Sequence, residues 1–165
     1  MIFVTVGTHE QPFNRLVEYM DMWAGEHDEK VVIQTGYANY EPKNAVTRKF
    51  LPYGEMVENV DRARIVITHG GPSSFMMPLQ IGKTPIVMPR THTLGEHVND
   101  HQVVFSHAVE ERTHSIVVVE NREELFNAIE NYDILSGSGK RAVGSNNENF
   151  CSDFSVIVND LFGEK

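Results

Sequence analysis

The sequence has very little cysteine: Cys151 is the only one in 165 residues. A single thiol excludes a disulfide within the chain and a metal site built from several thiolates, and it fits a reducing compartment. The apolar start, Met1 to Val6, has no basic segment before it and is far shorter than the roughly 20 residues of a membrane span. It therefore predicts a buried strand instead of a signal or an anchor.

Basic residues are also scarce. Lys and Arg number 14 against 23 Asp and Glu, which leaves a formal charge of −9 and a pI near 5.3. Binding to DNA or RNA needs a basic face that neutralises phosphates, so no nucleic-acid partner is expected. With 41% hydrophobic residues and no biased segment, the chain should fold as one domain over residues 1–165, and a second full domain does not fit.

Short β-branched runs alternate with longer amphipathic segments. Strands are expected at Ile2–Val6, Lys30–Gln34, Thr47–Leu51, Arg64–Thr68, Thr84–Met88 and Ser115–Val119. Helices are expected at Pro12–Trp23, Tyr53–Val60, Ser73–Ile81, Glu96–Ala108, Arg122–Asn131 and from about Asn147 to Leu161. Unbroken Val and Ile runs and this alternation indicate parallel crossovers with both sheet faces covered. The predicted fold class is α/β, a Rossmann-like doubly wound parallel sheet, and the Ser- and Gly-rich stretch predicts a flexible connection and a C-terminal helix over 136–165.

Ligands of such sheets bind outside the carboxyl ends of the strands, so the residues that follow each strand are the candidates for a site. The most informative of these loops is the run from Thr68 to Ser74, in which an apolar strand gives way to glycines and hydroxyls and then to a helix. Glycine lets N–H groups approach an anion closely, and the first turn of a helix offers unpaired N–H donors. This junction predicts the binding of a nucleotide or a sugar phosphate.

Four segments in this order resemble the C-terminal domain of glycosyltransferase family 28: Val4–Thr8, Thr68–Ser74, Gly82–Arg90 and Gly95–Gln102. The chain looks most similar to the small single-domain branch, the catalytic half of two-part transferases in bacterial capsule and exopolysaccharide assembly and in dolichol-linked chitobiose synthesis. The resemblance implies the donor half of a GT-B enzyme, which holds a UDP-sugar with no metal and no other cofactor. Helix N-termini would then do the work of a cation.

The same resemblance implies partners. A GT-B enzyme closes two Rossmann-like domains around donor and acceptor, so a separate membrane-anchored subunit is expected to bind the lipid-linked saccharide acceptor. Anionic lipid repels a domain of charge −9, so the partner should recruit this cytoplasmic chain to the inner face of the membrane. Apolar surface meant for the partner could drive a homodimer of the isolated chain. The expected activity is inverting transfer of a hexose or N-acetylhexosamine in polysaccharide biosynthesis.

The glycine-rich junction is expected to hold the donor's diphosphate. Its N–H groups and hydroxyls would stabilise the charge that grows on the leaving UDP, and the residues concerned are Gly70, Gly71, Ser73 and Ser74. An ordinary helix N-cap after a tight turn is the alternative. His69 could bond a phosphate oxygen or tie the loop to a neighbouring carbonyl, and a catalytic use would give a pH dependence near neutrality.

The resemblance implies that the loop after the first strand lines the same cleft. Gly7 and Thr8 would contact the nucleotide sugar, although Gly7 could serve only the turn. Inverting transfer needs a base that takes a proton from the acceptor hydroxyl, and His9 and Glu10 are the candidates for this catalytic role.

Near the donor's sugar, the resemblance places Asp100, His101 and Gln102, whose carboxylate and amide can bind hydroxyl groups. A solvated helix face would have the same composition. His97 and His101 are expected four residues apart on one helix face beside Asp100, which makes a metal-dependent hydrolase an alternative. The segment lacks the His-Glu-x-x-His pattern, and beyond His92 no third ligand is obvious, so no metal site is predicted.

Arg90 follows a buried strand and would pair with a donor phosphate or, structurally, with Glu96. Glu96 and His97 are expected in the first turn of the following helix, where a carboxylate suits the positive end of the dipole. By family analogy the segment Phe50–Tyr53 borders the uracil, although an ordinary turn over the core would explain it as well.

One position departs from the family pattern. Many relatives carry an acidic residue in the helix after the glycine loop, used to hold ribose hydroxyls, whereas this chain has Met77, followed by Pro78 inside the expected helix. Either the ribose is held differently, or donor affinity depends on the partner, or activity has been lost. The alternative function is therefore a non-catalytic nucleotide-sugar-binding or scaffolding subunit.

Overall fold

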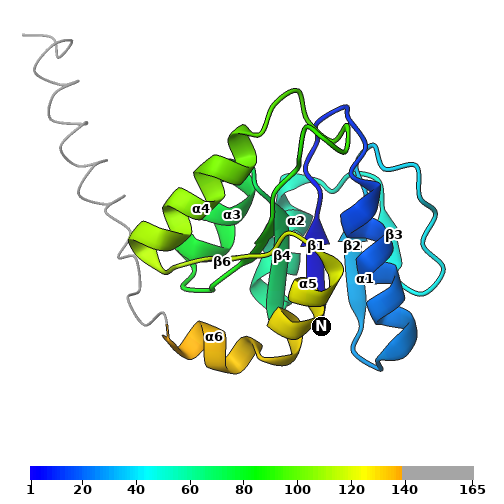
Figure 1. Cartoon of the computed structure of the whole chain (residues 1–165). Coiled ribbons are helices and arrows are strands. Elements are labelled where there is room, and N and C mark those ends of the chain that lie inside the picture. Colours follow the sequence, from blue (N-terminus) through cyan, green and yellow to red (C-terminus); the bar gives the residue numbers. More distant parts are fainter. Residues whose placement is uncertain (139–165) are drawn as a thin grey trace, which may run out of the picture.

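Six parallel strands form the sheet of the computed structural model, which describes residues 1–138 (Figure 1). They are β1 (Ile2–Thr5), β2 (Val31–Gln34), β3 (Val46–Arg48), β4 (Ile65–His69), β5 (Ile86–Met88) and β6 (Val117–Val118). The strand order is β3-β2-β1-β4-β5-β6, and every neighbouring pair is parallel. The predicted fold class is confirmed.

The helices cover both faces of this sheet. They are α1 (Asn14–Glu26), α2 (Tyr53–Arg62), α3 (Pro72–Gln80), α4 (His101–Thr113), α5 (Arg122–Glu130) and α6 (Tyr132–Ser138). Helices α1 and α5 pack on one face, and α2, α3 and α4 on the other (Figure 1). Side chains of β1 alternate between these two faces. Ile2 and Val4 pack with the residues of α1 and α5, whereas Phe3 packs on the opposite face, under α2. Burial on both faces explains the unbroken apolar runs of the strands.

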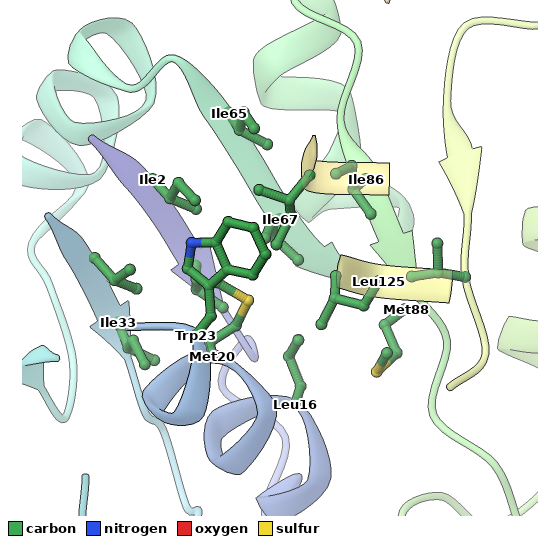
Figure 2. Packing of buried hydrophobic residues seen from close by; sticks show 14 of the residues in the cluster. Ile2, Leu16, Met20, Trp23, Ile33, Ile65, Ile67, Ile86, Met88 and Leu125 are labelled. Atoms are coloured by element: carbon green, nitrogen blue, oxygen red, sulfur yellow. The ribbon is translucent and has the colours of Figure 1, made fainter. Parts of the chain in front are cut away.

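The larger core lies between the sheet and helices α1 and α5. Figure 2 shows Met20 and Trp23 of α1 lying against Ile2 and Ile67 of the sheet, with Leu125 of α5 completing the cluster. All five side chains are at most 4% exposed. Since full burial of one such side chain is worth about 1.5–3 kcal/mol, this face fixes α1 against the sheet and thereby fixes the loop that follows β1.

Strand β3 is shorter than predicted and shifted toward the N-terminus, at Val46–Arg48 in place of Thr47–Leu51. The Leu51 N–H donates to the side-chain Oε1 of Gln34 at 3.2 Å, so this residue leaves the ladder. Pro52 follows directly and has no N–H to offer to a neighbouring strand.

Helix α4 starts at His101, so the prediction of a helix from Glu96 is wrong. The preceding segment forms turns in which carboxylates bind backbone N–H groups. Asp100 accepts the N–H of His92 at 2.8 Å, and Glu96 accepts that of Thr91 at 3.0 Å. Such local side-chain bonds offer the backbone an alternative to the helix.

Helix α6 covers Tyr132–Ser138, so the first three residues of the expected flexible connection are helical. Tyr132 is buried, and its hydroxyl donates to the Thr84 carbonyl at 2.8 Å, which holds this helix to the sheet. The rest of that connection and the helix expected from Asn147 to Leu161 lie outside the described residues. Within residues 1–138, no helix is long and apolar enough to cross a bilayer.

Candidate functional site

A cleft of about 630 Å³ opens at the carboxyl ends of β1 and β4. These strands are neighbours in the middle of the sheet, with β2 and β3 beyond β1 and with β5 and β6 beyond β4. The reversal of strand order at this point leaves a crevice between loops, which is where open α/β sheets bind ligands. Its lining residues are Thr5, Gly7, Thr8, His9, Gln34, Leu51, Tyr53, Met56, His69, Ser73, Ser74 and Met77.

His69, the last residue of β4, lies between two glycines. A Cβ on Gly7 would come within 2.4 Å of His69 Cε1, and a Cβ on Gly71 would come within 2.3 Å of its Nε2. Gly7 also has φ +75°, a conformation that other residues rarely adopt. Both glycines are therefore required to admit the imidazole to the floor of the cleft.

The imidazole of His69 is neutral near pH 7. His69 is only 8% exposed, and burial, followed by the positive charge of Arg90, lowers its pKa to about 4. Its Nδ1 is buried without a hydrogen bond of normal geometry in the described part of the chain, although the backbone of Thr5 is near enough to raise the pKa somewhat. A titration of His69 is thus expected well below neutrality, unlike the sequence-based expectation.

Helix α3 presents an uncapped N-terminus to the cleft. Gly71 is its N-cap residue, and Pro72 at the first position has no N–H to satisfy. The N–H of Ser74 turns back to the Gly71 carbonyl at 3.0 Å, whereas the Ser73 N–H and both serine hydroxyls have no partner within residues 1–138. Free donors at the positive end of a helix dipole favour an anion.

Gly70 has a different place from Gly71. A Cβ at Gly70 would come within 2.9 Å of both Gln102 Cβ and Ser106 Oγ, so this glycine lets helix α4 approach the loop closely. The side chain of Gln102 is only 9% exposed, and its Oε1 accepts the Arg90 N–H at 3.2 Å. Gln102 therefore holds the loop after β5 in this structure.

His9 stands at the rim of the cleft on the loop after β1. Its Nδ1 accepts the Gln11 N–H at 3.2 Å, which places the proton of the neutral ring on Nε2. Partial burial, then the charges of Arg90 and His97, lower its pKa, and the two imidazole rings lie 5.1 Å apart. In this geometry His9 offers a donor to a ligand. Glu10 is exposed and does not line the cleft.

Arg90 is fully buried and does not reach the cleft. Its Nη1 donates to the carbonyls of Gln11 at 2.7 Å and Glu96 at 3.1 Å, and its Nη2 donates to the Val6 carbonyl at 2.8 Å. The guanidinium thus cross-links the loops that follow β1 and β5. This arrangement corrects the expectation of contact with a phosphate, and we assign Arg90 to positioning these loops.

Glu96 is also buried outside the cleft. Its two carboxylate oxygens accept from Nε and Nη2 of Arg15, both at 2.9 Å. Arg15 is therefore the ionic partner of Glu96, and the expected pair with Arg90 does not form. Because Glu96 and His97 precede α4, their expected place in its first turn is wrong as well.

Asp100, His101 and Gln102 lie beside the loop after β5 and do not line the cleft between β1 and β4. His97 precedes α4 while His101 is its first residue, so the expected pair on one helix face does not form. No group of three His, Cys, Asp or Glu side chains that could hold a metal occurs within residues 1–138.

Three residues that line the cleft were not predicted from the sequence: Thr5, Gln34 and Met56. Gln34 is 3% exposed, and its Nε2 donates to Thr5 Oγ1 at 3.2 Å. Thr5 and Gln34 are the last residues of β1 and β2 and pair with each other. Their position at the carboxyl edge of the sheet was the signal that could have identified them as lining residues.

Comparison with solved structures gives similar folds at low sequence identity. A calicheamicin glycosyltransferase, CalG4, matches with a TM-score of 0.64 at 15% identity over 99% of this chain and 44% of its own. SnogD from Streptomyces nogalater, a glycosyltransferase, matches with a TM-score of 0.58 at 16% identity over 86% of this chain and 37% of its own. The glycotransferase of kitacinnamycin has the same TM-score of 0.58 at 16% identity, over 87% of this chain and 40% of its own. The chain thus spans less than half of the length of each.

No curated protein sequence matches the chain. Residues 1–148 match the sequence model of one protein family, the glycosyltransferase family 28 C-terminal domain. This match contains the cleft, the uncapped start of α3 and both glycines around His69. The chain therefore belongs to glycosyltransferase family 28, of which it forms the C-terminal, GT-B type domain.

Proposed function

We propose that this chain is the catalytic, donor-binding subunit of an inverting glycosyltransferase. It would move a hexose or N-acetylhexosamine from a UDP-sugar to a lipid-linked saccharide in polysaccharide biosynthesis. The observation that carries the proposal is the cleft over the uncapped start of α3, where N–H groups, hydroxyls and imidazoles meet and no carboxylate lies in the described lining. A diphosphate suits this set of donors, and membership of the family favours a nucleotide sugar as its source.

The proposed chemistry places negative charge at α3. As the acceptor hydroxyl attacks the anomeric carbon and the bond to the diphosphate breaks, the N–H of Ser73 and the hydroxyls of Ser73 and Ser74 would stabilise the leaving oxyanion. The acceptor's proton needs a base. His9 donates from Nε2 while its Nδ1 accepts from Gln11, so it suits a phosphate or sugar oxygen, and Glu10 becomes the better candidate for the base within this chain.

We further propose that a membrane-anchored subunit binds the acceptor and brings this chain to the inner face of the membrane. The family resemblance and the net charge of −9, which disfavours direct contact with anionic lipid, support this arrangement. Without the partner, exposed apolar residues before and in α4 could bring two copies together; Leu94, Val98 and Val104 are 60%, 66% and 69% exposed.

A second candidate is a subunit that binds nucleotide sugars without turnover. The specific observation in its favour is Met77, which lines the cleft and cannot bind ribose hydroxyls as a carboxylate would. Transfer measured with the membrane partner present separates the two, because retained binding without any transfer supports the second candidate.

Calorimetric titration with UDP, UDP-glucose, UDP-galactose, UDP-N-acetylglucosamine and GDP, each with and without EDTA, tests the donor site. We expect UDP-selective binding that EDTA does not change and that Gly71→Asp abolishes, since the new side chain would occupy the space of His69. Gly137→Asp adds the same charge in α6, with nothing within 4 Å of its Cβ, and should bind normally. If no nucleotide binds, alone or with the membrane partner, the transferase proposal fails.

A further inference from the structure

We propose that the cleft does not distinguish ribose from 2′-deoxyribose, so that nucleoside diphosphate sugars of both series can serve as donors. This inference rests on the proposed function, since it concerns the nucleoside of the same donor. The parts of the donor that the cleft recognises would then be the base, the diphosphate and the transferred sugar.

The cleft has two chemically different ends. At one end lie the donors already described, His69 and the first turn of α3. At the other end its lining is almost entirely apolar and comes from α2, its approach and the second turn of α3: Leu51, Tyr53, Met56 and Met77. A diphosphate at the polar end therefore directs the attached nucleoside over the apolar end.

The spacing along α3 places the ribose near Met77. Ser73 and Met77 are four residues apart, so their side chains lie on one face of the helix, about 6 Å apart along its axis. The ribose is joined to the first phosphate through only C5′ and one oxygen, which is a similar reach. When the phosphate is at Ser73, the sugar ring lies one turn farther along, over the Met77 side chain.

The thioether of Met77 is held in this place by packing. Met77 is half-buried and packs, with Leu51 and Met56, against the cluster formed by Phe3, Val60 and neighbouring residues under α2. A thioether sulfur is only a weak hydrogen-bond acceptor. Two methionines and a leucine therefore line this end of the cleft, and none of them offers a strong hydrogen-bond acceptor to the ribose hydroxyls.

Of the polar side chains nearest to this end, one is bonded within the protein and the other lies at the rim. Gln34 donates from Nε2 to Thr5 Oγ1 and accepts the Leu51 N–H at Oε1, each at 3.2 Å. The Tyr53 phenol belongs to a side chain that is 76% exposed, so it remains hydrated at the rim. A site that hydrogen-bonds a hydroxyl rejects the analogue without it, whereas a site with no partner for that hydroxyl gains nothing from it.

Calorimetric titration of the whole chain with UDP and with 2′-deoxyuridine diphosphate tests the inference without any mutation. We expect dissociation constants within about threefold of each other. UDP binding more than about tenfold tighter than the deoxy ligand would overturn the inference and leave the proposed function intact. If neither ligand binds, with or without the membrane partner, the proposed function itself fails.

Substitutions at two neighbouring methionines test the placement of the ribose. Met77→Glu should raise the ratio of the two dissociation constants to about tenfold or more in favour of UDP, because a carboxylate accepts from ribose hydroxyls. The ratio is insensitive to the repulsion between the new charge and the diphosphate, since both ligands carry the same phosphates. Met76→Glu is the matched control, because Met76 is 44% exposed and does not line the cleft, and it should leave the ratio unchanged.

Thermal unfolding of each variant shows whether it folds. If Met77→Glu does not fold, Met77→Gln supplies an uncharged acceptor at the same position, and the wild-type ratio still decides the inference. A folded Met77→Glu that binds both ligands with an unchanged ratio would contradict the placement of the ribose over Met77.

Discussion

The imidazole of His69 occupies the space that a side chain on Gly71 would need, because a Cβ there would lie 2.3 Å from Nε2. Gly71 itself has φ −78° and ψ 125°, which any residue can adopt. Only the ring forbids a side chain at this position. At Gly7 the positive φ forbids it as well.

This difference predicts a selective rescue. Gly71→Ala should destabilise the fold by about 1–3 kcal/mol through overpacking, and a second substitution, His69→Ala, should remove most of that cost. The same second substitution should rescue Gly7→Ala much less, because the backbone strain at Gly7 remains. Urea unfolding of the single and double variants measures both effects.

Gly54→Ala is the control, since nothing lies within 4 Å of its Cβ and it sits in helix α2. It should be neutral or slightly stabilising. A Gly71→Ala variant as stable as the wild type would show that the His69 ring moves aside at no cost.

The low pKa of His69 predicts an acid-sensitive fold. The pKa of His69 is about 4 in the folded chain and near 6.5 in the unfolded chain. Between these two pH values the unfolded chain binds a proton at His69 and the folded chain does not. Stability is therefore complete above about pH 6.5 and falls as the pH decreases toward 4, by about 2 kcal/mol between pH 7 and 5. His69→Gln should lack this loss, and melting temperatures at pH 4.5–7.5 measure it. Parallel pH curves of the two proteins would contradict the prediction.

Arg90 predicts an effect on binding without contact with the ligand. Arg90→Lys keeps a charge but cannot reach three carbonyls in the same plane, so we expect a loss of about 3 kcal/mol of stability. UDP affinity should also fall, because the Val6 carbonyl held by Arg90 directly precedes Gly7 in the cleft. Titration well below the unfolding temperature separates the two effects. Arg112→Lys, at an exposed position in the last turn of α4, should change neither.

A buried carboxylate orders the loop between β2 and β3. Asp21 of α1 is 2% exposed and accepts the N–H groups of Lys43, Asn44 and Ala45 and the hydroxyl of Tyr40. Burial alone would raise the pKa of Asp21, but these bonds together lower it below its usual value.

Asp21→Asn should therefore cost about 2–3 kcal/mol in urea unfolding, because one carbonyl oxygen cannot replace two charged acceptors. The exposed Asp28→Asn makes the same chemical change without such partners and should be nearly neutral. An equal effect of the two substitutions would show that the carboxylate of Asp21 does not order this loop.

Periodicity and local chemistry predicted the sheet and the start of α3, because buried strands and the glycine-to-helix junction depend on neighbouring residues. They failed at Glu96, where distant residues decide the structure. Its carboxylate pairs with Arg15, which is 81 positions away, and this contact favours turns over the expected helix.

The role of Arg90 was hidden for the same reason. A sequence shows an arginine after a strand, but it does not show that two loops fold over the side chain and accept hydrogen bonds from both of its Nη atoms. The paired ends of β1 and β2 show the converse case. The place of Thr5 and Gln34 in the cleft could have been predicted from strand register alone, because neighbouring parallel strands end at the same edge of the sheet.

The pairing of β1 with β4 has a consequence for the order of events during synthesis. Ile2 pairs with Ile65 and Thr5 with Thr68, so the two sides of the cleft meet only after a long intervening segment has been made. On the proposed function, the donor site is complete only once α3 has been synthesised. Ligand binding is then linked to the complete sheet, so a saturating nucleotide should act as a folding chaperone for the whole domain and raise its melting temperature.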